Sequence, residues 1–357
     1  MGGAERAGVK WGLPERFELN PPHPPHACGV GPSLSPLKGG EGKTDAEQAE
    51  WKMPDIKILA RDLGFPEGPV WMSDGSVILG EISGRKVTRV APDGSKSEIG
   101  KAGGGPNGLA TGPDGALYVC NNGGAVYQTN PSFLSTGPGP DYKGGSIQRI
   151  DPKTGETRVL YSECNGHKLS APNDIVFDSE GGFYFTDLGK RYANQRDHGG
   201  LYYALPDGSQ VVELAYPMLT PNGVGLSPDE RTVYVADTES SRLFAFDILE
   251  PGKIKHEPFP APYGGRCVCG LPGFQRFDSL AVEASGNICV ATLIAGCITV
   301  ISPSGQVVRQ VKMPDVYPTN ICFGGPDLRT AYITLSASGQ LAAMEWPEPG
   351  LRLNFMA

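Results

Sequence analysis

The sequence lacks an excess of positive charge and lacks any long hydrophobic run. Its 357 residues carry 31 Lys and Arg against 39 Asp and Glu, which gives a net charge of −8. Surfaces that bind nucleic acid are basic, so this balance predicts no nucleic-acid partner. The most apolar stretch, residues 288–301, is shorter than the roughly 18–20 residues of a membrane-spanning helix. Gly296 also interrupts it, so we expect two β-strands around a turn there, and no membrane partner.

Signs of secretion are missing as well. The N-terminus has no continuous apolar segment like that of a secretory signal, and the eight cysteines are irregularly spaced. Such spacing is not typical of a disulfide framework, so we expect reduced thiols and a cytoplasmic location. Cys267 and Cys269 form a CxC pair, but no second pair or neighbouring His completes a zinc or redox site.

Residues 1–52 differ in composition from the rest of the chain. They contain the runs PPHPPH and EGKTDAEQAE and show no sustained apolar periodicity. A segment with so little apolar surface to bury does not form a core. We therefore expect a disordered or leader segment in which His23 and His26 are solvated. Met53 precedes the first strand-like run, IKILARDL, and we expect the folded domain to span residues 53–357.

Glycine and proline are abundant, and a repeated pattern of strands and turns accompanies them. The 50 glycines and 33 prolines are nearly a quarter of the chain, about twice the usual share, which excludes long helices for most of it. From Met53 onward a polar residue, a short apolar strand, a Gly-bearing turn and a second strand recur. The six copies are EGPVWMSDGSVIL, PNGLATGPDGALYV, PNDIVFDSEGGFYFTD, PNGVGLSPDERTVYVAD, DSLAVEASGNICVA and TNICFGGPDLRTAYIT.

The spacing of these copies indicates the architecture. They start 40–66 residues apart, which suits one four-stranded blade each. We predict an all-β fold, a six-bladed β-propeller with four-stranded blades. The closing blade should combine the C-terminal strands with the N-terminal run IKILARD.

A polar residue stands at the start of each copy. The inner strands of a propeller line the central channel and run the same way, so these residues should meet at one mouth of the channel. They are Glu67, Asn107, Asn173, Asn222, Asp278 and Asn320. A cluster of oxygen donors favours a hard cation, Ca²⁺ first, with Mg²⁺, Mn²⁺ and Zn²⁺ as alternatives. Each Asn taken alone is also a common turn residue, but the shared register favours a central metal site.

Four segments together resemble one protein family. FPEGPVW, SAPNDIVFDSEGGFYFTD, TPNGVGLSPDERTVYVADT and PTNICFGGPDLRTAYIT are similar to the SMP-30/gluconolactonase family, which includes regucalcin, Drp35-type lactonases and the diisopropylfluorophosphatase. The resemblance covers Leu59 to Trp346 and implies a six-bladed propeller with a catalytic divalent cation. By this resemblance Glu67, Asn173, Asn222 and Asp278 are the metal-binding residues, while Asn107 and Asn320 lie on the substrate side.

The chain departs from the family pattern at some positions. Regucalcin-like sugar lactonases have an Arg where this chain has Ala171, and Ser279 after Asp278 resembles the Drp35-like members. The loops at residues 123–145 and 262–277 are long and are expected to act as lids. Their aromatic residues could form a wall of the site: Tyr127, Phe133, Tyr142, Phe274 and Phe277. His167, six residues before Asn173, is a further candidate for substrate binding, although such a histidine more often lies in a surface loop.

These observations predict a Ca²⁺-dependent hydrolase that opens the lactone ring of a small-molecule lactone or ester substrate. Asp278 is the candidate catalytic residue, as general base or, alternatively, as nucleophile. A phosphotriesterase-like hydrolase that uses the same site, and a non-catalytic calcium-stabilised propeller, are the alternatives. No GxSxG nucleophile elbow is present. We expect a monomer or a small homo-oligomer.

Overall fold

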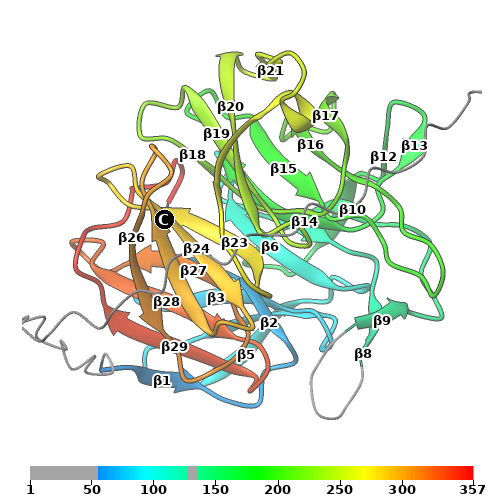
Figure 1. The fold of residues 1–357 in the computed structure, drawn as a ribbon. Coiled ribbons are helices and arrows are strands. Elements are labelled where there is room, and N and C mark those ends of the chain that lie inside the picture. The colour runs from blue at the N-terminus through cyan, green and yellow to red at the C-terminus, as the bar shows by residue number, and fades with distance from the viewer. Residues whose placement is uncertain (1–54, 128–134, 357) are drawn as a thin grey trace, which may run out of the picture. The chain divides into compact units, whose positions relative to one another are not determined.

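The computed structural model describes residues 55–127 and 135–356, and nearly all of their regular structure is β-strand. The expected leader segment (residues 1–52, with His23 and His26) and Phe133 lie outside the described residues. The strands within the described ranges form six sheets arranged as the blades of a propeller (Figure 1). The predicted all-β, six-bladed architecture is therefore confirmed.

Each blade begins with an inner strand next to the channel, and the following strands lie progressively further out. Blade 1 comprises β2 (Pro66–Trp71), β3 (Val77–Glu81), β4 (Lys86–Val90) and β5 (Lys96–Gly100). Blade 2 comprises β6 (Pro106–Thr111), β7 (Leu117–Asn121), β10 (Ser146–Ile150) and β11 (Thr157–Tyr161). Blade 3 comprises β14 (Pro172–Phe177), β15 (Phe183–Asp187), β16 (Gly199–Ala204) and β17 (Val211–Met218).

The second half of the ring follows the same plan with one variation. Blade 4 comprises β18 (Pro221–Leu226), β19 (Thr232–Asp237) and β20 (Arg242–Glu250), and both β21 (Lys253–Ile254) and β22 (Arg266–Gly270) pair with β20. Blade 5 comprises β23 (Arg276–Val282), β24 (Ile288–Leu293), β25 (Cys297–Ile301) and β26 (Val307–Lys312). The apolar stretch at residues 288–301 thus forms two strands around a turn, as predicted.

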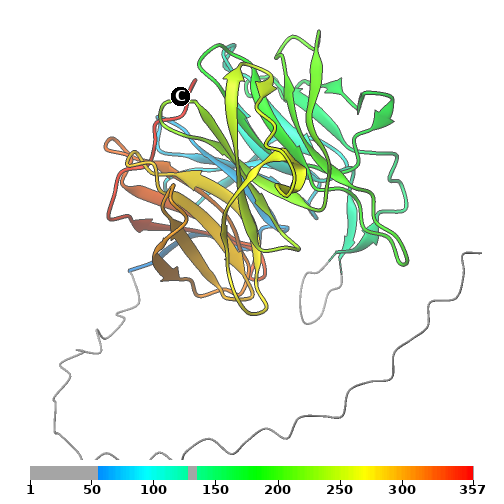
Figure 2. The same cartoon turned by 45° about the horizontal axis from the view of Figure 1, so that its top comes forward.

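Blade 6 joins the two ends of the folded region. It comprises β27 (Pro318–Gly324), β28 (Thr330–Leu335), β29 (Gln340–Glu345) and, as its outer strand, β1 (Lys57–Ala60). β1 runs antiparallel to β29, with Ile58 opposite Ala342. Figure 2 shows the blue N-terminal strand beside the red C-terminal strand. The predicted closure is therefore confirmed, and it leaves no inner strand without a neighbour on either side.

Short elements occupy the connections between strands. Two hairpins lie outside the blades, β8 (Ala125–Tyr127) with β9 (Ser135–Pro138), and β12 (Glu163–Cys164) with β13 (His167–Lys168). One 3-10 turn, η1 (Pro262–Gly264), precedes β22. Part of the segment 262–277, expected to be a lid, thus pairs with β20 in blade 4.

The apolar core is divided among the interfaces between blades. The described residues form six buried clusters, and each draws its side chains from two neighbouring blades. Strands covered on both faces bury most of their side chains, which explains why β3, β7 and β15 are buried along their whole length. The hydrophobic effect thus holds each blade against the next and the ring as a whole.

All six inner strands contain an irregularity at the predicted polar residue. The pairing register with the second strand shifts at the start of each inner strand, next to or across that residue. A β-bulge re-aims the side chains beside it and is common next to functional sites. In β14 the shift lies between Pro172 and Ile175, so it contains both Asn173 and Asp174.

Close approach of neighbouring inner strands requires glycine beside the polar residues. A Cβ atom on Gly108 would lie 2.5 Å from the backbone oxygen of Asn173 and 2.6 Å from the Cα of Asp174. Gly68 follows Glu67 with a φ of +55°, and a Cβ there would lie 2.4 Å from the backbone oxygen of Asn107. The backbones of β2, β6 and β14 are therefore in contact around the channel, with no room for a side chain between them.

The C-terminal segment crosses the far end of the channel. A cavity of about 200 Å³ there is lined by the later residues of the inner strands and by residues 351–354. The backbone N–H of Leu351 donates to the carbonyl of Val282 (2.8 Å), and Asn354 Nδ2 donates to the carbonyl of Phe177 (3.2 Å). A second cavity lies at the other end, where the inner strands begin.

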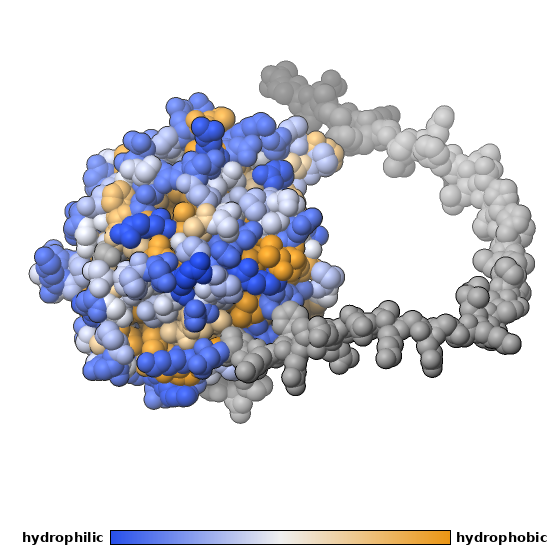
Figure 3. Space-filling model, turned by 90° about the vertical axis from the view of Figure 1, so that its left-hand side faces the viewer, coloured by the Kyte–Doolittle hydropathy of each residue, from blue (hydrophilic) through white to orange (hydrophobic). Residues whose placement is uncertain are grey.

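Three further observations concern the surface, membrane-spanning helices and the cysteines. Figure 3 shows one face of the propeller, on which hydrophobic side chains form separate patches among hydrophilic ones. No helix in the described ranges is long and apolar enough to cross a bilayer. The seven cysteines of the described ranges, Cys267 and Cys269 among them, are free thiols.

The glycine contact leads to a stability test. We expect Gly108→Ala to lower the free energy of unfolding by about 1–3 kcal/mol, because its Cβ would overlap backbone atoms that cannot move independently. Gly225→Ala on β18 is the matched control, since its Cβ would meet only the terminal methyl of Leu280 at 2.6 Å and a Val282 methyl at 3.3 Å. Urea unfolding of both variants in the presence of chelator should show the larger loss for Gly108→Ala. Equal losses would contradict the backbone contact.

Candidate functional site

Five of the six repeated polar residues line one cavity at the start of the inner strands. Glu67, Asn107, Asn173, Asn222 and Asp278 all contribute to a cavity of about 210 Å³. Their exposed fractions are only 3–7%, so they form its bottom. Sequence positions more than 200 residues apart thus share one small buried space, because each blade delivers its inner strand to the same axis.

The bottom of this cavity concentrates negative charge. Burial, followed by the nearby Asp174 carboxylate, raises the pKa of Glu67 to about 8. Burial also raises the pKa of Asp278 well above its ordinary value, and the charges of Glu67 and Asp174 add to the effect. The pKa of Asp174 itself is raised to about 7 by burial. Three carboxyl groups therefore sit together, and no ion pair between described residues involves them.

Asp174 was not singled out from the sequence. It directly follows Asn173, and an alternating strand would point it away from the residues that line the cavity. Asp174 indeed lines the far-end cavity, but its charge is close enough to raise the pKa of both Glu67 and Asp278. Its carboxylate accepts hydrogen bonds from the N–H groups of Ile175 (3.0 Å) and Val224 (3.4 Å). The dipeptide ND in place of NG was the available sequence signal.

Two amide oxygens at the same place have no partner. The Oδ1 atoms of Asn107 and Asn173 are buried and accept no hydrogen bond from any described residue. The Oδ1 of Asn222 accepts only a long bond from the Ser279 hydroxyl (3.3 Å), while its Nδ2 donates to Thr238 (3.0 Å). A buried polar atom without a partner is rare and calls for a ligand or a water. These oxygens therefore face the space that the carboxylates also face.

This donor set fits a hard cation. Carboxylate and amide oxygens are the ligands that Ca²⁺ prefers, and a cation would offset the charge of the buried carboxylates. Among the described residues no three His, Cys, Asp or Glu side chains form a metal-binding group by themselves. A metal here would therefore depend on the amide oxygens of Asn173 and Asn222 together with Glu67 and Asp278.

The other two sequence candidates lie elsewhere. Asn320 lines the far-end cavity and not the one described above. Its Nδ2 donates to Glu67 Oε2 (3.2 Å), so it orients that carboxylate. His167 on β13 contacts Glu213 (Nε2 to Oε2, 2.7 Å) and stacks on Tyr216. It is not among the residues that line the cavity, so the substrate-binding role expected for these two residues stays a prediction.

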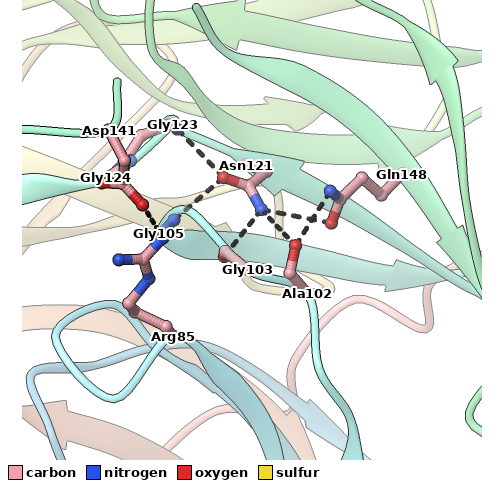
Figure 4. Close-up of polar contacts among 10 residues, drawn as sticks. Arg85, Ala102, Gly103, Gly105, Asn121, Gly123, Gly124, Asp141 and Gln148 are labelled. Atoms are coloured by element: carbon pink, nitrogen blue, oxygen red, sulfur yellow. Dashed lines mark hydrogen bonds and ion pairs between the residues drawn. The ribbon is translucent and has the colours of Figure 1, made fainter. Parts of the chain in front are cut away.

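Polar residues at the ends of second strands hold the loops that lead into the inner strands. Asp187 at the end of β15 accepts the N–H groups of Ser170 (2.6 Å) and Ala171 (2.7 Å), just before Asn173. In blade 2 the equivalent residue is Asn121, whose contacts Figure 4 shows. Its Oδ1 accepts the N–H of Gly105 (2.9 Å), and its Nδ2 donates to the carbonyls of Ala102 and Gly103. These bonds set the position of Asn107 two residues later.

The walls of the cavity combine apolar and cationic side chains. Phe65 and Tyr127 pack ring against ring, with centroids 5.1 Å apart, and both line the cavity. Of the other aromatic residues proposed from the sequence, Phe277 is fully buried and Phe274 is 75% exposed. The cationic lining residues are Lys190, Arg191, Arg196 and Arg276. The sequence analysis did not consider them, although the run GKRYANQRD places three cations within seven residues of an acidic chain.

Comparison with known proteins identifies the family. A family model described as the SMP-30/Gluconolactonase/LRE-like region matches residues 65–337. The chain belongs to this family. The match contains all six repeats, so the family relationship and the repeat analysis describe the same part of the chain.

Individual family members are related over most of their length. The chain is 29% identical over 284 residues to a protein named lactonase drp35 from Staphylococcus saprophyticus, which covers 79% of each chain. It is 25% identical over 309 residues to a gluconolactonase from Zymomonas mobilis, again with 79% of each chain covered.

Solved structures share the propeller fold. A gluconolactonase from Xanthomonas campestris has a TM-score of 0.64 at 23% identity, covering 82% of this chain and 89% of that one. A calcium-binding protein, regucalcin, from Agrobacterium tumefaciens has a TM-score of 0.61 at 17% identity, covering 84% and 98%. At these identities the likeness establishes the fold.

The crowding of carboxylates gives a prediction for the chelated protein. With divalent cations removed, we expect Asp278→Asn to raise the free energy of unfolding by about 1 kcal/mol or more, because it removes a buried charge that faces other carboxylates. Asp315→Asn is the matched comparison, since Asp315 accepts the N–H groups of Tyr317 and Ser338, and this variant should be destabilised. Urea unfolding in EDTA checks the two signs. A loss of stability in both variants would contradict the repulsion at the bottom of the cavity.

Proposed function

We propose that this protein is a calcium-dependent lactonase that opens the ring of a small-molecule lactone. The observation that carries the proposal is the buried set of carboxylate and unpartnered amide oxygens at the bottom of a cavity. Membership of the family and the names of the related lactonase and gluconolactonase support this choice of reaction.

Glu67, Asn173, Asn222 and Asp278 would hold the cation. Their oxygens come from four different blades and converge with little exposure to solvent. The two carboxylates balance a divalent charge, and the amide oxygens add ligands without adding repulsion. Asn107, with its free Oδ1, completes the polar surface at the same depth.

The chain's own residues supply positioning and proton transfer. The bound cation would polarise the lactone carbonyl and offset the negative charge that develops on its oxygen. Asp278 lines the cavity, so its carboxylate can take a proton from the water that attacks the carbonyl carbon. The ring C–O bond then breaks, and the released alkoxide takes up that proton. Phe65 and Tyr127 provide apolar surface for the rest of the substrate.

The test combines stability and turnover. Calcium at roughly a hundred times its dissociation constant should stabilise the wild-type protein by about 2–3 kcal/mol, and EDTA should reverse this. Asp278→Asn should lose the calcium-dependent stabilisation and lower kcat by about a hundredfold to ten-thousandfold. Asp178→Asn is the charge-matched control, because Asp178 contacts Tyr203 and Gly182 away from the cavity.

The substrates are an aldonolactone, an aromatic lactone such as dihydrocoumarin, and a phosphotriester. Lactone hydrolysis that disappears with EDTA and in Asp278→Asn, but persists in Asp178→Asn, supports the proposal. An Asp278→Asn protein that binds calcium and keeps full activity would exclude the role of Asp278. Turnover of the phosphotriester alone would replace lactonase with the phosphotriesterase-like alternative.

A further inference from the structure

The cavity has cationic side chains above its anionic bottom. Lys190, Arg191 and Arg196 come from the loop between β15 and β16, and Arg276 is the first residue of β23. Within the described ranges, Glu239 is the single acidic residue that lines the cavity apart from Glu67 and Asp278 at its bottom. A protein with a net charge of −8 thus gathers four cations at the wall of its candidate site.

Lys190 is buried without an ion-pair partner. It is 6% exposed, and its Nζ donates one hydrogen bond, to the carbonyl of Asn122 (2.7 Å). The Nζ also lies 4.6 Å from the centre of the Tyr142 ring. An ammonium group carries three donors, so two are left over. Burial lowers the pKa of Lys190 to about 8, and the charges of Asp187 and Asp197 only partly counter this.

These two neighbouring carboxylates are engaged elsewhere. Asp187 accepts backbone N–H groups from the loop before β14. Asp197 accepts the hydroxyl of Tyr192 (3.0 Å). Neither forms an ion pair with Lys190 by the N–O distance, and both lie behind the cavity surface, since neither lines it. The ammonium group therefore has free donors at a cavity wall.

The arginines also have few ion-pair partners. Arg196 (3.3 Å) and Arg276 (3.0 Å) share the single carboxylate of Glu239. Arg191 is exposed and forms no ion pair with any described residue. A guanidinium presents a planar fork of donors that matches a carboxylate or a phosphate. An anion in this cavity would meet several donors that the protein itself leaves unused.

We propose that the substrate is an anionic lactone, whose carboxylate or phosphate is held by Lys190 and Arg191, with Arg196 and Arg276 beside them. This inference rests on the proposed lactonase function. The neutral lactone ring then lies towards Glu67 and Asp278, and the charged group lies towards the cavity wall. The two ends of the substrate are thereby distinguished, because the cationic side chains that attract an anion line the cavity wall, whereas the carbonyl of the ring lies at the bottom.

Two matched substrate pairs separate charge from shape. The first pair is the γ-lactone of D-gluconate and the γ-lactone of D-glucarate closed on the same hydroxyl, which differ by a terminal alcohol against a carboxylate. The second pair is the δ-lactone of D-gluconate and its terminal phosphate ester. We expect kcat/KM to be about tenfold or more higher for the charged member of at least one pair. The pair that shows the difference identifies the group.

Substitutions test whether the cationic residues of the cavity wall cause the preference for the charged lactone. Arg191→Glu and Lys190→Gln should lower kcat/KM for the charged lactone by about tenfold or more, mainly through KM, and change it less than about twofold for the neutral partner. Arg158→Gln, on the exposed outer strand β11, is the control and should change neither. Circular dichroism and the calcium-dependent unfolding shift verify that each variant is folded.

The outcomes distinguish this inference from the proposed function. Equal rates within both pairs, or an equal loss for charged and neutral lactones in the variants, overturn the anionic substrate and leave the lactonase intact. If no lactone is hydrolysed, the lactonase proposal fails. Calorimetric titration with D-glucarate and inorganic phosphate then tests whether the four cationic residues bind an anion. Binding of either anion that is weakened in Arg191→Glu supports an anion site, and absence of binding overturns it.

Discussion

Carboxylates that meet at the axis of a closed ring are the constraint on which this structure depends. Glu67, Asp174 and Asp278 come from blades 1, 3 and 5 and are buried together. Each is harder to ionise than an ordinary carboxyl because burial removes its water, and the charges of neighbouring carboxylates add to the effect at Glu67 and Asp278. The remainder of the ring must hold these groups in place against that repulsion. The apolar clusters between all neighbouring blades supply the stabilisation that does so.

Rigidity at this point comes from backbone contacts more than from side-chain packing. The inner strands touch through glycine at Gly68 and Gly108, and each strand carries a register shift at the same level. The side chains of Asn121 (Figure 4) and Asp187 accept backbone hydrogen bonds that hold the loops leading into the inner strands of their blades. These contacts and hydrogen bonds form a rigid backbone frame, which fixes the positions of the unpartnered oxygens of Asn107 and Asn173. Such a frame provides the preorganisation that electrostatic catalysis requires.

The cavity is divided by charge along its depth. Carboxylates and amide oxygens form the bottom, whereas Lys190 and three arginines stand along the wall. Within the described residues the few carboxylates near the wall are bonded to backbone groups or shared between two arginines. The proposed cation at the bottom and the proposed anion at the wall would satisfy both ends. Three of the four cationic residues belong to the loop between β15 and β16, and Arg276 begins β23. A loop can change without changing the propeller, so one fold can carry different sites.

The repeat alone was enough to determine the all-β fold, the six blades, the closure by β1 and the set of polar residues at the start of each copy. These follow from local patterns, since turn residues and strand periodicity are written in consecutive residues. The direction of each side chain was decided by the tertiary structure. The Asn320 side chain donates to Glu67, and His167 stacks on Tyr216, and neither contact is visible in the sequence. Asp174 lies near Glu67 and Asp278 at the register shift of β14, and Lys190 lines the cavity because of the path of the loop between β15 and β16. Both depend on contacts between blades, and residues that lie far apart in the chain leave no trace of such contacts in a single sequence.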